Sequence, residues 1–474
     1  MSSPRRLSAD VSGRRSFLKK STLGVATGNV LALARSAHAA GGDVLRIGLI
    51  GCGGRGNGAA AQALLADKNT KLVALGDAFS DQLQRSRSLL KQHDKIGDRV
   101  EVNDDHCFVG FDAYKQVIAS DVDIVLLASP PHFRPQHLAA AVEAGKHVFA
   151  EKPVAVDALG VQKVLEACAL AKRNSTAVVS GLCWRYSNVA RASIQQIHDG
   201  AVGEIVALEA TYNASLPGKA WPMVRESGWS DMEWQMRNWY WFTWLSGDHI
   251  VEQAVHSIDK IAWALHDKPP VSAVSLGGLQ ARFGDPRSIL ADAEAIARGA
   301  RKSTGGSDSA TSKVTSAVDQ ALYGDASIFD HHSVTYEYPG GIPCYFNCRQ
   351  QPGTTSNVSS RVLGTKGICN IEDGKITSRS GEKLWRYRGP KNVMHQTEHD
   401  EMYAALRSGK IVNDGDFMCG STLLAIMGRL ASYSGKKLSW QQAQASKENL
   451  SPAKYEWGPA PKAEIAVPGV TPLV

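Results

Sequence analysis

The stretch that decides the fold of this chain is residues 44–58, VLRIGLIGCGGRGNG. An apolar run with β-branched residues leads directly into glycines, and a segment of small residues with helical character follows. This order is typical of a dinucleotide-binding fingerprint, although glycine-rich turns also occur without a ligand. Gly51 would permit the sharp turn, Gly53 the approach of a pyrophosphate, and Gly56 the close packing of helix on strand. The predicted phosphate-binding residues are Gly51, Gly53, Gly54, Arg55 and Gly56.

Residues 1–39 resemble a twin-arginine export signal. The motif RRSFLKK begins at Arg14, an apolar run rich in Ser, Thr, Gly and Ala covers residues 21–34, and the small residues at 37–39 suit a signal peptidase. The alternative is a disordered basic tail. Because the apolar run is too short to span a bilayer, we expect the twin-arginine translocation machinery to deliver a soluble mature protein to the periplasm, with no membrane partner.

The export signal also accounts for the charge of the chain. The formal net charge is +7, and residues 1–39 contain seven Lys and Arg residues against one Asp, which gives +6 of that total. The remainder therefore carries about +1. Such a nearly neutral chain gives no reason to expect binding to nucleic acid or to an anionic membrane surface, because both depend on clustered positive charge.

The eight cysteines show no paired spacing typical of a disulfide scaffold. Several lie in apolar strand-like or helix-like contexts, where cysteine usually acts as a small buried hydrophobe. Proteins that use the twin-arginine route are transported folded, so the fold and its cofactor can assemble in the reducing cytoplasm. Cys344 and Cys348 have a spacing that a metal could use, but no further ligands accompany them, and we predict no metal.

The chain after the signal is long enough for about two domains with sizeable cores. Three apolar runs alternate with helix-like segments: residues 71–75, residues 121–129 and the short run before EKP. This alternation predicts a doubly wound α/β domain with a parallel sheet. We assign residues 40–152 to this nucleotide-binding domain and residues 153–474 to a second, substrate-binding domain. Residues 286–325, which include KSTGGSDSATSK, are interpreted as a flexible insertion.

An acidic residue ends the second predicted strand, where the adenosine ribose of a dinucleotide would lie. Asp77 stands 26 positions after Gly51, and a carboxylate there can accept hydrogen bonds from both ribose hydroxyls and repel a 2′-phosphate. Asp77 therefore favours NAD, although Arg85 and Arg87 nearby keep NADP possible and a solvated loop aspartate is the alternative. The other predicted cofactor-binding residues are Ser129, Pro130, Glu151 and Lys152.

Three segments together carry a resemblance to a known family. IGLIGCGGRG (47–56), ASPPHFRPQHLAAAVEAGKHVFAEKP (128–153) and VEQAVHSID (251–259) resemble the Gfo/Idh/MocA oxidoreductases, with similarity from residue 44 to about residue 440. The resemblance implies a Rossmann domain followed by an α+β domain with a large, mainly antiparallel sheet, which often mediates oligomerisation, so we expect a homodimer or homotetramer. It also implies that Lys152 points at the nicotinamide and the substrate hydroxyl, where an ammonium group stabilises a developing alkoxide. Without that context, a lysine is most often a surface residue.

A polar segment, SGDHIVEQAVHSID, covers residues 246–259. The spacing of Glu252, His256 and Asp259 places them on one face of a single predicted helix. The family pattern D-x-x-x-H-x-x-D implies that His256 is the catalytic histidine, which accepts the hydroxyl proton. Glu252 stands where aspartate is common, so its reach and role stay open between substrate binding and tuning of Lys152. The residues that could alternatively bind zinc or manganese are Asp248, His249, Glu252 and His256.

Polar and aromatic side chains of the second domain suggest the substrate contacts. The resemblance makes Arg185 and Tyr186 candidate contacts to a polyhydroxylated ligand. The aromatic-rich stretch 221–244 is either core or the stacking surface of a sugar site, and His331 and His332 either line the cleft or lie at a solvated edge. The predicted substrate residues are Arg185, Tyr186, Asp248, His249 and Asp259. Further predicted elements are a helix at 157–173, a hairpin at 333–350 and closing helices at 398–407 and 419–434.

Three kinds of function are compatible with these residues. The first is an NAD(P)-dependent oxidoreductase that takes hydride from a secondary hydroxyl of a sugar, polyol or related carbohydrate, with Lys152, His256 and Glu252 as catalytic residues. Because free NAD is scarce outside the cytoplasm, we expect its cofactor to be tightly held. The second is a glycosidase that oxidises its substrate, eliminates the glycosidic substituent and re-reduces the product. The third is a non-catalytic dinucleotide-binding sensor, against which the joint presence of Lys152 and His256 argues.

Overall fold

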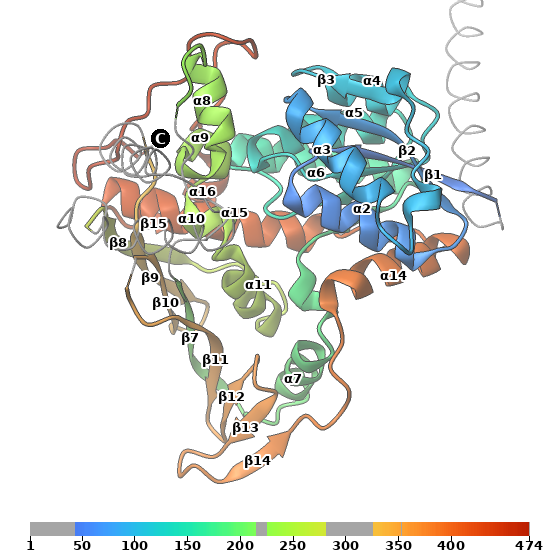
Figure 1. Cartoon of the computed structure of the whole chain (residues 1–474). Helices are drawn as coiled ribbons and strands as arrows, with labels where there is room; N and C mark the ends of the chain where they lie inside the picture. The colour runs from blue at the N-terminus through green and yellow to red at the C-terminus, as the bar shows by residue number, and fades with distance from the viewer. Residues whose placement is uncertain (1–42, 215–224, 281–325, 352, 474) are drawn as a thin grey trace, which may run out of the picture.

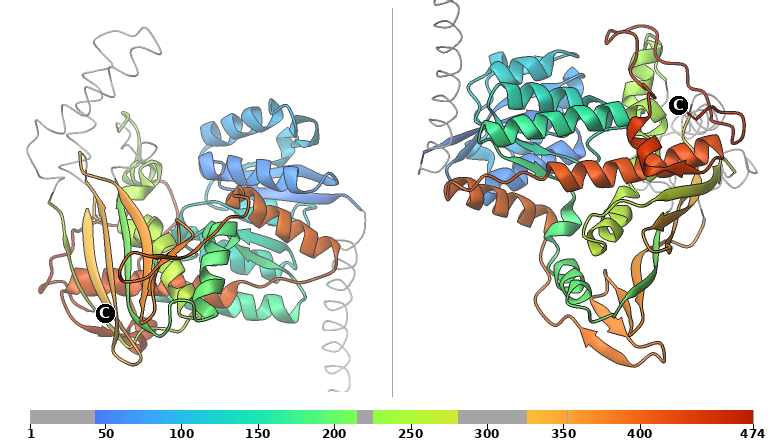
Figure 2. Two further views of the ribbon diagram at one scale, coloured as in Figure 1. Left: turned by 90° about the horizontal axis from the view of Figure 1, so that it is seen from below. Right: turned by 180° about the vertical axis from the view of Figure 1, so that it is seen from behind.

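The computed structural model describes residues 43–214, 225–280, 326–351 and 353–473 (Figure 1). The predicted export signal and the predicted insertion lie outside these residues. The chain forms a parallel sheet enclosed by helices and, beside it, a larger mixed sheet with helices on the face toward the first domain (Figures 1 and 2). Among the described residues, no helix has the length and apolar character needed to cross a bilayer.

The doubly wound α/β domain that the sequence predicts is confirmed. Its six strands are all parallel and follow the order β3-β2-β1-β4-β5-β6. The strands are β1 (Leu45–Ile50), β2 (Thr70–Asp77), β3 (Cys107–Val109), β4 (Ile124–Leu127), β5 (His147–Ala150) and β6 (Val178–Ser180). The helices are α2 (Gly54–Ala66), α3 (Ser80–Lys91), α4 (Ala113–Ala119), α5 (Arg134–Glu143) and α6 (Ala158–Arg173).

The parallel sheet extends past the domain boundary predicted at residue 152. The predicted helix at 157–173 is confirmed as α6, and the Asp157 carboxylate caps it by accepting a hydrogen bond of 2.7 Å from the Gly160 amide. After this crossover helix, β6 pairs in parallel with β5, so that Val148 lies opposite Val178. Because a parallel strand needs such a crossover, the first domain includes α6 and β6.

The second domain is built on a mixed, mostly antiparallel sheet, as predicted. Its nine strands follow the order β14-β13-β12-β11-β7-β10-β9-β8-β15, and only the β7–β10 pair among them is parallel. The strands are β7 (Ile205–Ala214), β8 (Ser272–Gly278), β9 (His331–Tyr338), β10 (Ile342–Gln350), β11 (Asn357–Gly364), β12 (Ile368–Asn370), β13 (Lys375–Thr377), β14 (Lys383–Arg386) and β15 (Leu438–Ser439). The predicted hairpin at 333–350 is confirmed as β9 and β10.

The remaining helices pack between the sheets or return to the first domain. They are α7 (Asn188–His198), α8 (Asp231–Arg237), α9 (Thr243–Ser246), α10 (His249–Glu252), α11 (Val255–Ala264), α14 (Met394–Arg407), α15 (Gly415–Ser434) and α16 (Trp440–Ala445). The two predicted closing helices are therefore confirmed as α14 and α15, and each begins four residues before its predicted start.

Helix α15 joins the two domains. It packs against α6 of the first domain and against β8 and β9 of the mixed sheet (Figure 1). The alternation along β9 buries Val334, Tyr336 and Tyr338 on the face toward the helix. A Cβ atom on Gly428 of α15 would lie 2.5 Å from the Tyr336 hydroxyl, so glycine permits this close approach. The shared helix fixes the relative position of the two halves of the site described next.

Candidate active site

One cavity, with a volume of about 660 Å³, contains most of the predicted site residues. The glycine turn and the ends of β2, β4 and β5 form its nucleotide-domain wall, and β7, the segment 236–241 and helices α10 and α11 form the opposite wall. The predicted residues that line it are Gly51, Gly53, Gly54, Arg55, Asp77, Ser129, Pro130, Glu151, Lys152, Glu252 and His256. A cavity of this size suits a dinucleotide or another ligand of similar size.

The glycine turn has the geometry that a pyrophosphate requires. Gly51 has a φ of +95°, and a Cβ atom there would lie 2.3 Å from the Ser129 amide nitrogen. A Cβ atom on Gly56 would lie 1.9 Å from the Gly51 carbonyl oxygen, which explains the close packing of α2. Gly53 and Gly54 face open space, and no side chain caps the first turn of α2. The free amides of that turn can therefore bind phosphate oxygens.

Asp77 lies at the end of β2 and lines the cavity. Its carboxylate accepts hydrogen bonds from the amides of Cys52 (2.6 Å) and Phe79 (2.9 Å). Each carboxylate oxygen retains acceptor capacity for a ribose hydroxyl. Burial raises the pKa of Asp77. Arg85 and Arg87, the residues that kept NADP possible, do not line this cavity, and Arg87 instead bonds Asp104 at 2.5 Å.

The residues of the EKP motif take different partners. The Arg55 Nε atom lies 2.8 Å from Glu151 Oε1, so the buried Glu151 holds the arginine of the glycine turn. The Lys152 ammonium donates to the Glu252 carbonyl oxygen at 2.6 Å and to its Oε1 atom at 3.1 Å. The Lys152 and Glu252 side chains are 16% and 15% exposed, so this pair is largely shielded from solvent. Glutamate at position 252 thus fixes the lysine that the resemblance makes catalytic.

His256 lines the same cavity and is a neutral imidazole. Its Nδ1 atom is buried and has no hydrogen-bond partner among the described residues. Burial, with the nearby positive charge of Lys152, lowers its pKa well below the usual 6.5. A neutral, unpaired ring nitrogen beside an ammonium group is suited to accept a proton from a hydroxyl.

The single helix predicted through Glu252, His256 and Asp259 is wrong in one respect. The chain forms two helices, α10 and α11, because Ala254 bonds back five residues to the His249 carbonyl oxygen at 3.0 Å and widens the turn between them. Glu252 and His256 still reach the cavity, but Asp259 does not line it. The Asp259 carboxylate instead accepts from Arg185 at 2.8 Å.

Arg185 and Tyr186, two of the predicted substrate contacts, also lie outside the cavity lining. The Arg185 guanidinium binds Asp259 and Asp267 and lies 4.0 Å from the Phe417 ring centre. The Tyr186 hydroxyl is buried and donates to Asp414 at 3.3 Å. Since their polar groups are bonded within the protein, these side chains do not face the cavity.

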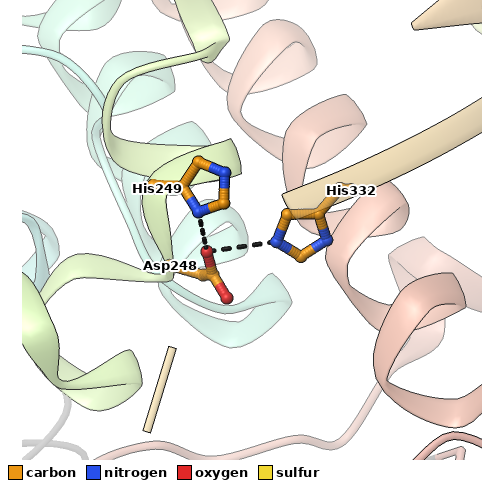
Figure 3. Close-up of side chains that lie close together, drawn as sticks. All are labelled: Asp248, His249 and His332. Atoms are coloured by element: carbon orange, nitrogen blue, oxygen red, sulfur yellow. Dashed lines mark hydrogen bonds and ion pairs between the residues drawn. The ribbon is translucent and has the colours of Figure 1, made fainter. Parts of the chain in front are cut away.

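Asp248 and His249, the remaining predicted substrate contacts, form a buried network with His332. Figure 3 shows the Asp248 carboxylate between the two imidazole rings, with its Oδ1 atom 2.8 Å from His249 Nδ1 and 3.1 Å from His332 Nε2. The other carboxylate oxygen accepts from the Tyr433 hydroxyl (2.6 Å) and the Phe329 amide (2.8 Å). One donor atom from each of Asp248, His249 and His332 lies within 4.8 Å of the others. The carboxylate thus accepts hydrogen bonds from His332, Tyr433 and Phe329, whereas neither buried ring nitrogen of His249 makes a hydrogen bond of standard geometry within the described residues.

The alternative metal site of Asp248, His249, Glu252 and His256 is not brought together. Glu252 and His256 face the cavity, whereas Asp248 and His249 point into the buried network. Of the paired histidines, His332 is part of that network, and His331 is half-exposed and bonded to Asp330 at 2.6 Å. Neither histidine lines the cavity.

Replacing Asp248 with asparagine is expected to lower the free energy of unfolding in urea by about 3 kcal/mol, because a buried charge network loses its anion. Asp94→Asn, at an exposed position, is the control. Burial alone would raise the pKa of Asp248, but His332 and His249 beside the carboxylate hold this pKa well below 3.8. Burial lowers the pKa of His332 below 6.5. Both groups bind more protons when unfolded, so stability falls as the pH is lowered, starting at about pH 6.5 for His332 and at about pH 4 for Asp248. A loss below about 1 kcal/mol, as for exposed pairs, would contradict the assignment.

The aromatic-rich stretch 221–244 contributes both to the core and to the cavity wall where the structure describes it. Trp234 and Trp244 are core residues, whereas Trp239, Tyr240 and Trp241 line the cavity. The Gln253 side-chain oxygen accepts from Gln350 at 2.5 Å, and Gln350 also donates to the Tyr240 hydroxyl. The result is an aromatic wall with amide and hydroxyl groups, which suits hydroxyl-rich ligands. Trp221 lies outside the described residues.

Several other residues of the cavity are absent from the sequence predictions. They are Phe79, Phe111, Arg134, Tyr212, Arg237, Gln253 and His395. Arg134 is buried, donates to the Pro153 carbonyl oxygen at 2.5 Å and has a pKa lowered by burial to about 10. It lies within the quoted motif ASPPHFRPQH, so the motif itself was a usable signal. Tyr212 and His395 come from distant segments and carry no local signal.

Comparison with known proteins agrees with this geometry. Residues 45–181 match the family described as an oxidoreductase family with an NAD-binding Rossmann fold, GFO_IDH_MocA. Inositol 2-dehydrogenase of Serratia proteamaculans is 29% identical over 223 residues, which cover 47% of this chain and 55% of that protein. A glycosyl hydrolase family 109 protein of Solibacter usitatus is 26% identical over 232 residues, which cover 47% of this chain and 51% of that protein. The alignments thus span about half the length of these relatives.

The fold is also that of solved structures of this kind. Scyllo-inositol dehydrogenase from Lactobacillus casei, solved with bound NAD(H) and scyllo-inositol, matches with a TM-score of 0.56 at 17% identity, over 84% of this chain and 100% of the other. Myo-inositol 2-dehydrogenase from Lactobacillus plantarum matches with a TM-score of 0.58 at 18% identity, over 84% and 99% of the two chains. Residues 45–181 thus resemble the Gfo/Idh/MocA oxidoreductases in sequence, and the described chain shares its fold with the two inositol dehydrogenase structures.

Proposed function

We propose that this chain is an NAD(P)-dependent oxidoreductase that acts on a secondary hydroxyl of a sugar, polyol or related carbohydrate. One observation carries the proposal: the glycine turn and Asp77 line the same cavity as Lys152, Glu252 and His256. The first group has the donors and acceptors for a pyrophosphate and a ribose, and the second has those for an alcohol that loses its proton. When bound, the nicotinamide would supply the hydride acceptor.

The roles of the catalytic residues follow from their partners. Glu252 holds the Lys152 ammonium in the cavity, where the ammonium can bind the substrate oxygen as negative charge develops on it. His256 is neutral and unpaired, so it can take the hydroxyl proton at its ring nitrogen. The aromatic wall of Trp239, Tyr240 and Trp241 would stack on the C–H faces of a sugar ring.

The relatives supply a second candidate of a different class. Similarity to a glycosyl hydrolase family 109 protein favours a glycosidase that oxidises, eliminates and re-reduces its substrate. The same lysine and histidine would serve that reaction. Net hydrolysis without net reduction of nucleotide distinguishes it from a dehydrogenase.

Two further proposals concern the whole protein. Residues 1–39 would direct the folded protein to the periplasm by the twin-arginine route. A homo-oligomer would bury the outer face of the mixed sheet, where Val274 and Leu276 of β8 and Tyr345 of β10 are exposed on either side of β9. Sedimentation of the purified mature protein measures the assembly state.

The test of the proposed function is direct. The mature protein is purified, denatured and analysed by mass spectrometry for released nucleotide, and the folded protein is tested with sugars and glycosides for nucleotide reduction and for hydrolysis. Bound or bindable NAD(P) and turnover of a carbohydrate are expected. The proposal is contradicted if denaturation releases no nucleotide and the folded protein also binds no added NAD(P). Nucleotide binding without turnover of any carbohydrate would instead favour the sensor hypothesis.

Asp77→Ala is expected to weaken NAD binding by about 10- to 100-fold and to raise the relative affinity for NADP, because two ribose hydrogen bonds and the charge repulsion of a 2′-phosphate are lost together. Titration of tryptophan fluorescence with each nucleotide measures both affinities. Arg87→Ala is the control, because Arg87 bonds Asp104 outside the cavity. An unchanged NAD to NADP ratio in Asp77→Ala would show that Asp77 does not set the preference.

A further inference from the structure

We propose that two segments form a clamp over the adenosine end of the cavity and slow the exchange of bound nucleotide. The clamp consists of Trp229 and Arg237, just before and at the end of α8, and of Tyr455 and Trp457 in the C-terminal segment. The proposal rests on the proposed function, because it requires the cavity to bind a dinucleotide. Neither segment belongs to the matched Rossmann region, residues 45–181.

The first half of the clamp fastens α8 to the first turn of α3 and to Phe79 in the loop before it. The Arg237 guanidinium bonds both carboxylate oxygens of Asp81, at 3.1 and 3.2 Å, and bonds Glu233 at 2.9 Å. The same group lies 4.0 Å from the ring centre of Phe79 and 4.8 Å from that of Trp229. The Arg237 guanidinium therefore lies over the ring of Phe79. Phe79 comes two residues after the predicted ribose ligand Asp77.

The second half comes from the C-terminal segment. The Trp457 ring centre lies 5.4 Å from that of Phe79 and 4.7 Å from that of Phe111. The Tyr455 ring centre is 6.3 Å from that of Phe111, and its hydroxyl lies 2.9 Å from His132 Nε2. These contacts reach the segments that follow β2, β3 and β4 of the nucleotide-binding domain.

The two halves are also bonded to each other. The Met232 amide of α8 donates to the Gly458 carbonyl oxygen at 2.9 Å, and the Gln235 side chain donates to the Pro461 carbonyl oxygen at 2.9 Å. The C-terminal segment therefore holds α8 in place while its aromatic side chains hold the loops of the first domain.

A second cavity, of about 730 Å³, lies on the other side of the clamp. Ala78, Phe79 and Arg237 line both cavities, so they form part of the wall between them. Trp229 and Trp457 line the second cavity but not the first. A nucleotide leaving by its adenosine end would have to displace Phe79, and this displacement breaks its contacts with Arg237 and Trp457 at the same time.

The experiment measures exchange of bound NAD against isotopically labelled NAD, by mass spectrometry after rapid desalting of the full mature protein. Trp457→Ala is expected to exchange about 10- to 100-fold faster than the wild type, because its ring contacts with Phe79 and Phe111 are lost. Asp81→Asn is expected to exchange about two- to fivefold faster, because the exposed ion pair that holds Arg237 over Phe79 is weakened. Trp457→Phe, which keeps an aromatic ring, should restore most of the slow exchange. Both altered side chains are substantially exposed, so the fold should be retained.

Matched controls separate the clamp from general loosening of the protein. Leu384→Ala removes another half-exposed apolar side chain, and Glu209→Gln breaks another exposed ion pair, with Arg361, and both lie on the mixed sheet. Exchange in these controls should equal that of the wild type. Wild-type exchange rates in Trp457→Ala and Asp81→Asn would overturn the clamp and leave the proposed function intact. A wild-type protein that binds no NAD would overturn both.

Discussion

Replacing Lys152 with methionine is expected to lower kcat/KM for the carbohydrate substrate by about 100- to 1,000-fold, because the developing alkoxide loses its only fixed ammonium partner in the proposed mechanism. Methionine keeps most of the side-chain length, so the cavity keeps its shape. NAD affinity, measured by fluorescence titration, should change far less than turnover. This pattern identifies a group that acts mainly in the transition state.

Two further variants serve as comparisons for the loss of activity in Lys152→Met. Lys163→Met alters an exposed lysine on α6 and should leave turnover unchanged. Glu252→Gln removes the charge that holds Lys152 but keeps the backbone carbonyl bond of 2.6 Å, so a smaller loss is expected. Full activity in Lys152→Met would exclude the lysine from the reaction and with it the proposed mechanism.

Replacing His256 with asparagine is expected to lower kcat by about 100- to 10,000-fold, the usual contribution of a positioned general base. The pH profile gives a sharper test than the rate. Burial and the charge of Lys152 hold the pKa of His256 below 6.5, so the base stays neutral at physiological pH and its activity is lost only as pH falls through the lowered pKa. The wild-type profile should therefore be flat from about pH 8 to pH 6.5 for this group.

The acid limb of the profile should disappear in His256→Asn, because no group then titrates in that role. His93→Asn, at an exposed position on the first domain, is the control and should keep the wild-type profile. A wild-type acid limb with its midpoint above pH 6.5 would contradict the environment described for His256. It would indicate a histidine whose charged form is stabilised.

The parts of the site that could be predicted are those in which one short segment contains both the structural and the chemical signal. In the glycine turn, Gly51 and Gly56 are required by the backbone itself, and Asp77 is placed by the end of the strand in which it lies. Lys152 comes two residues after a buried strand, but its role is implied only by the family resemblance, because a lysine is otherwise most often a surface residue. For Gly51, Gly56 and Asp77 local spacing sufficed, since the neighbouring residues determine the position of the backbone.

The residues that were misplaced depend on partners far away in the sequence. Arg185 was a plausible substrate contact until the structure paired it with Asp259 and Asp267, which lie 74 and 82 positions later. His332 was predicted at a cleft or an edge, but its partner Asp248 lies 84 positions earlier. Polar residues in such networks resemble site residues in sequence, because both are groups of charged and hydrogen-bonding side chains without a local explanation.

Helix α14 gives the order of synthesis a physical consequence. Its buried residues Met402, Tyr403 and Leu406 share a core with β1 and α2, and Arg407 bonds Asp67 at 2.6 Å. During translation the first domain therefore emerges with part of its apolar surface uncovered, and more than 200 residues follow Ser180 before the covering helix is made. We therefore expect the core of the first domain to be completed only after α14 has left the ribosome, late in the synthesis of the chain.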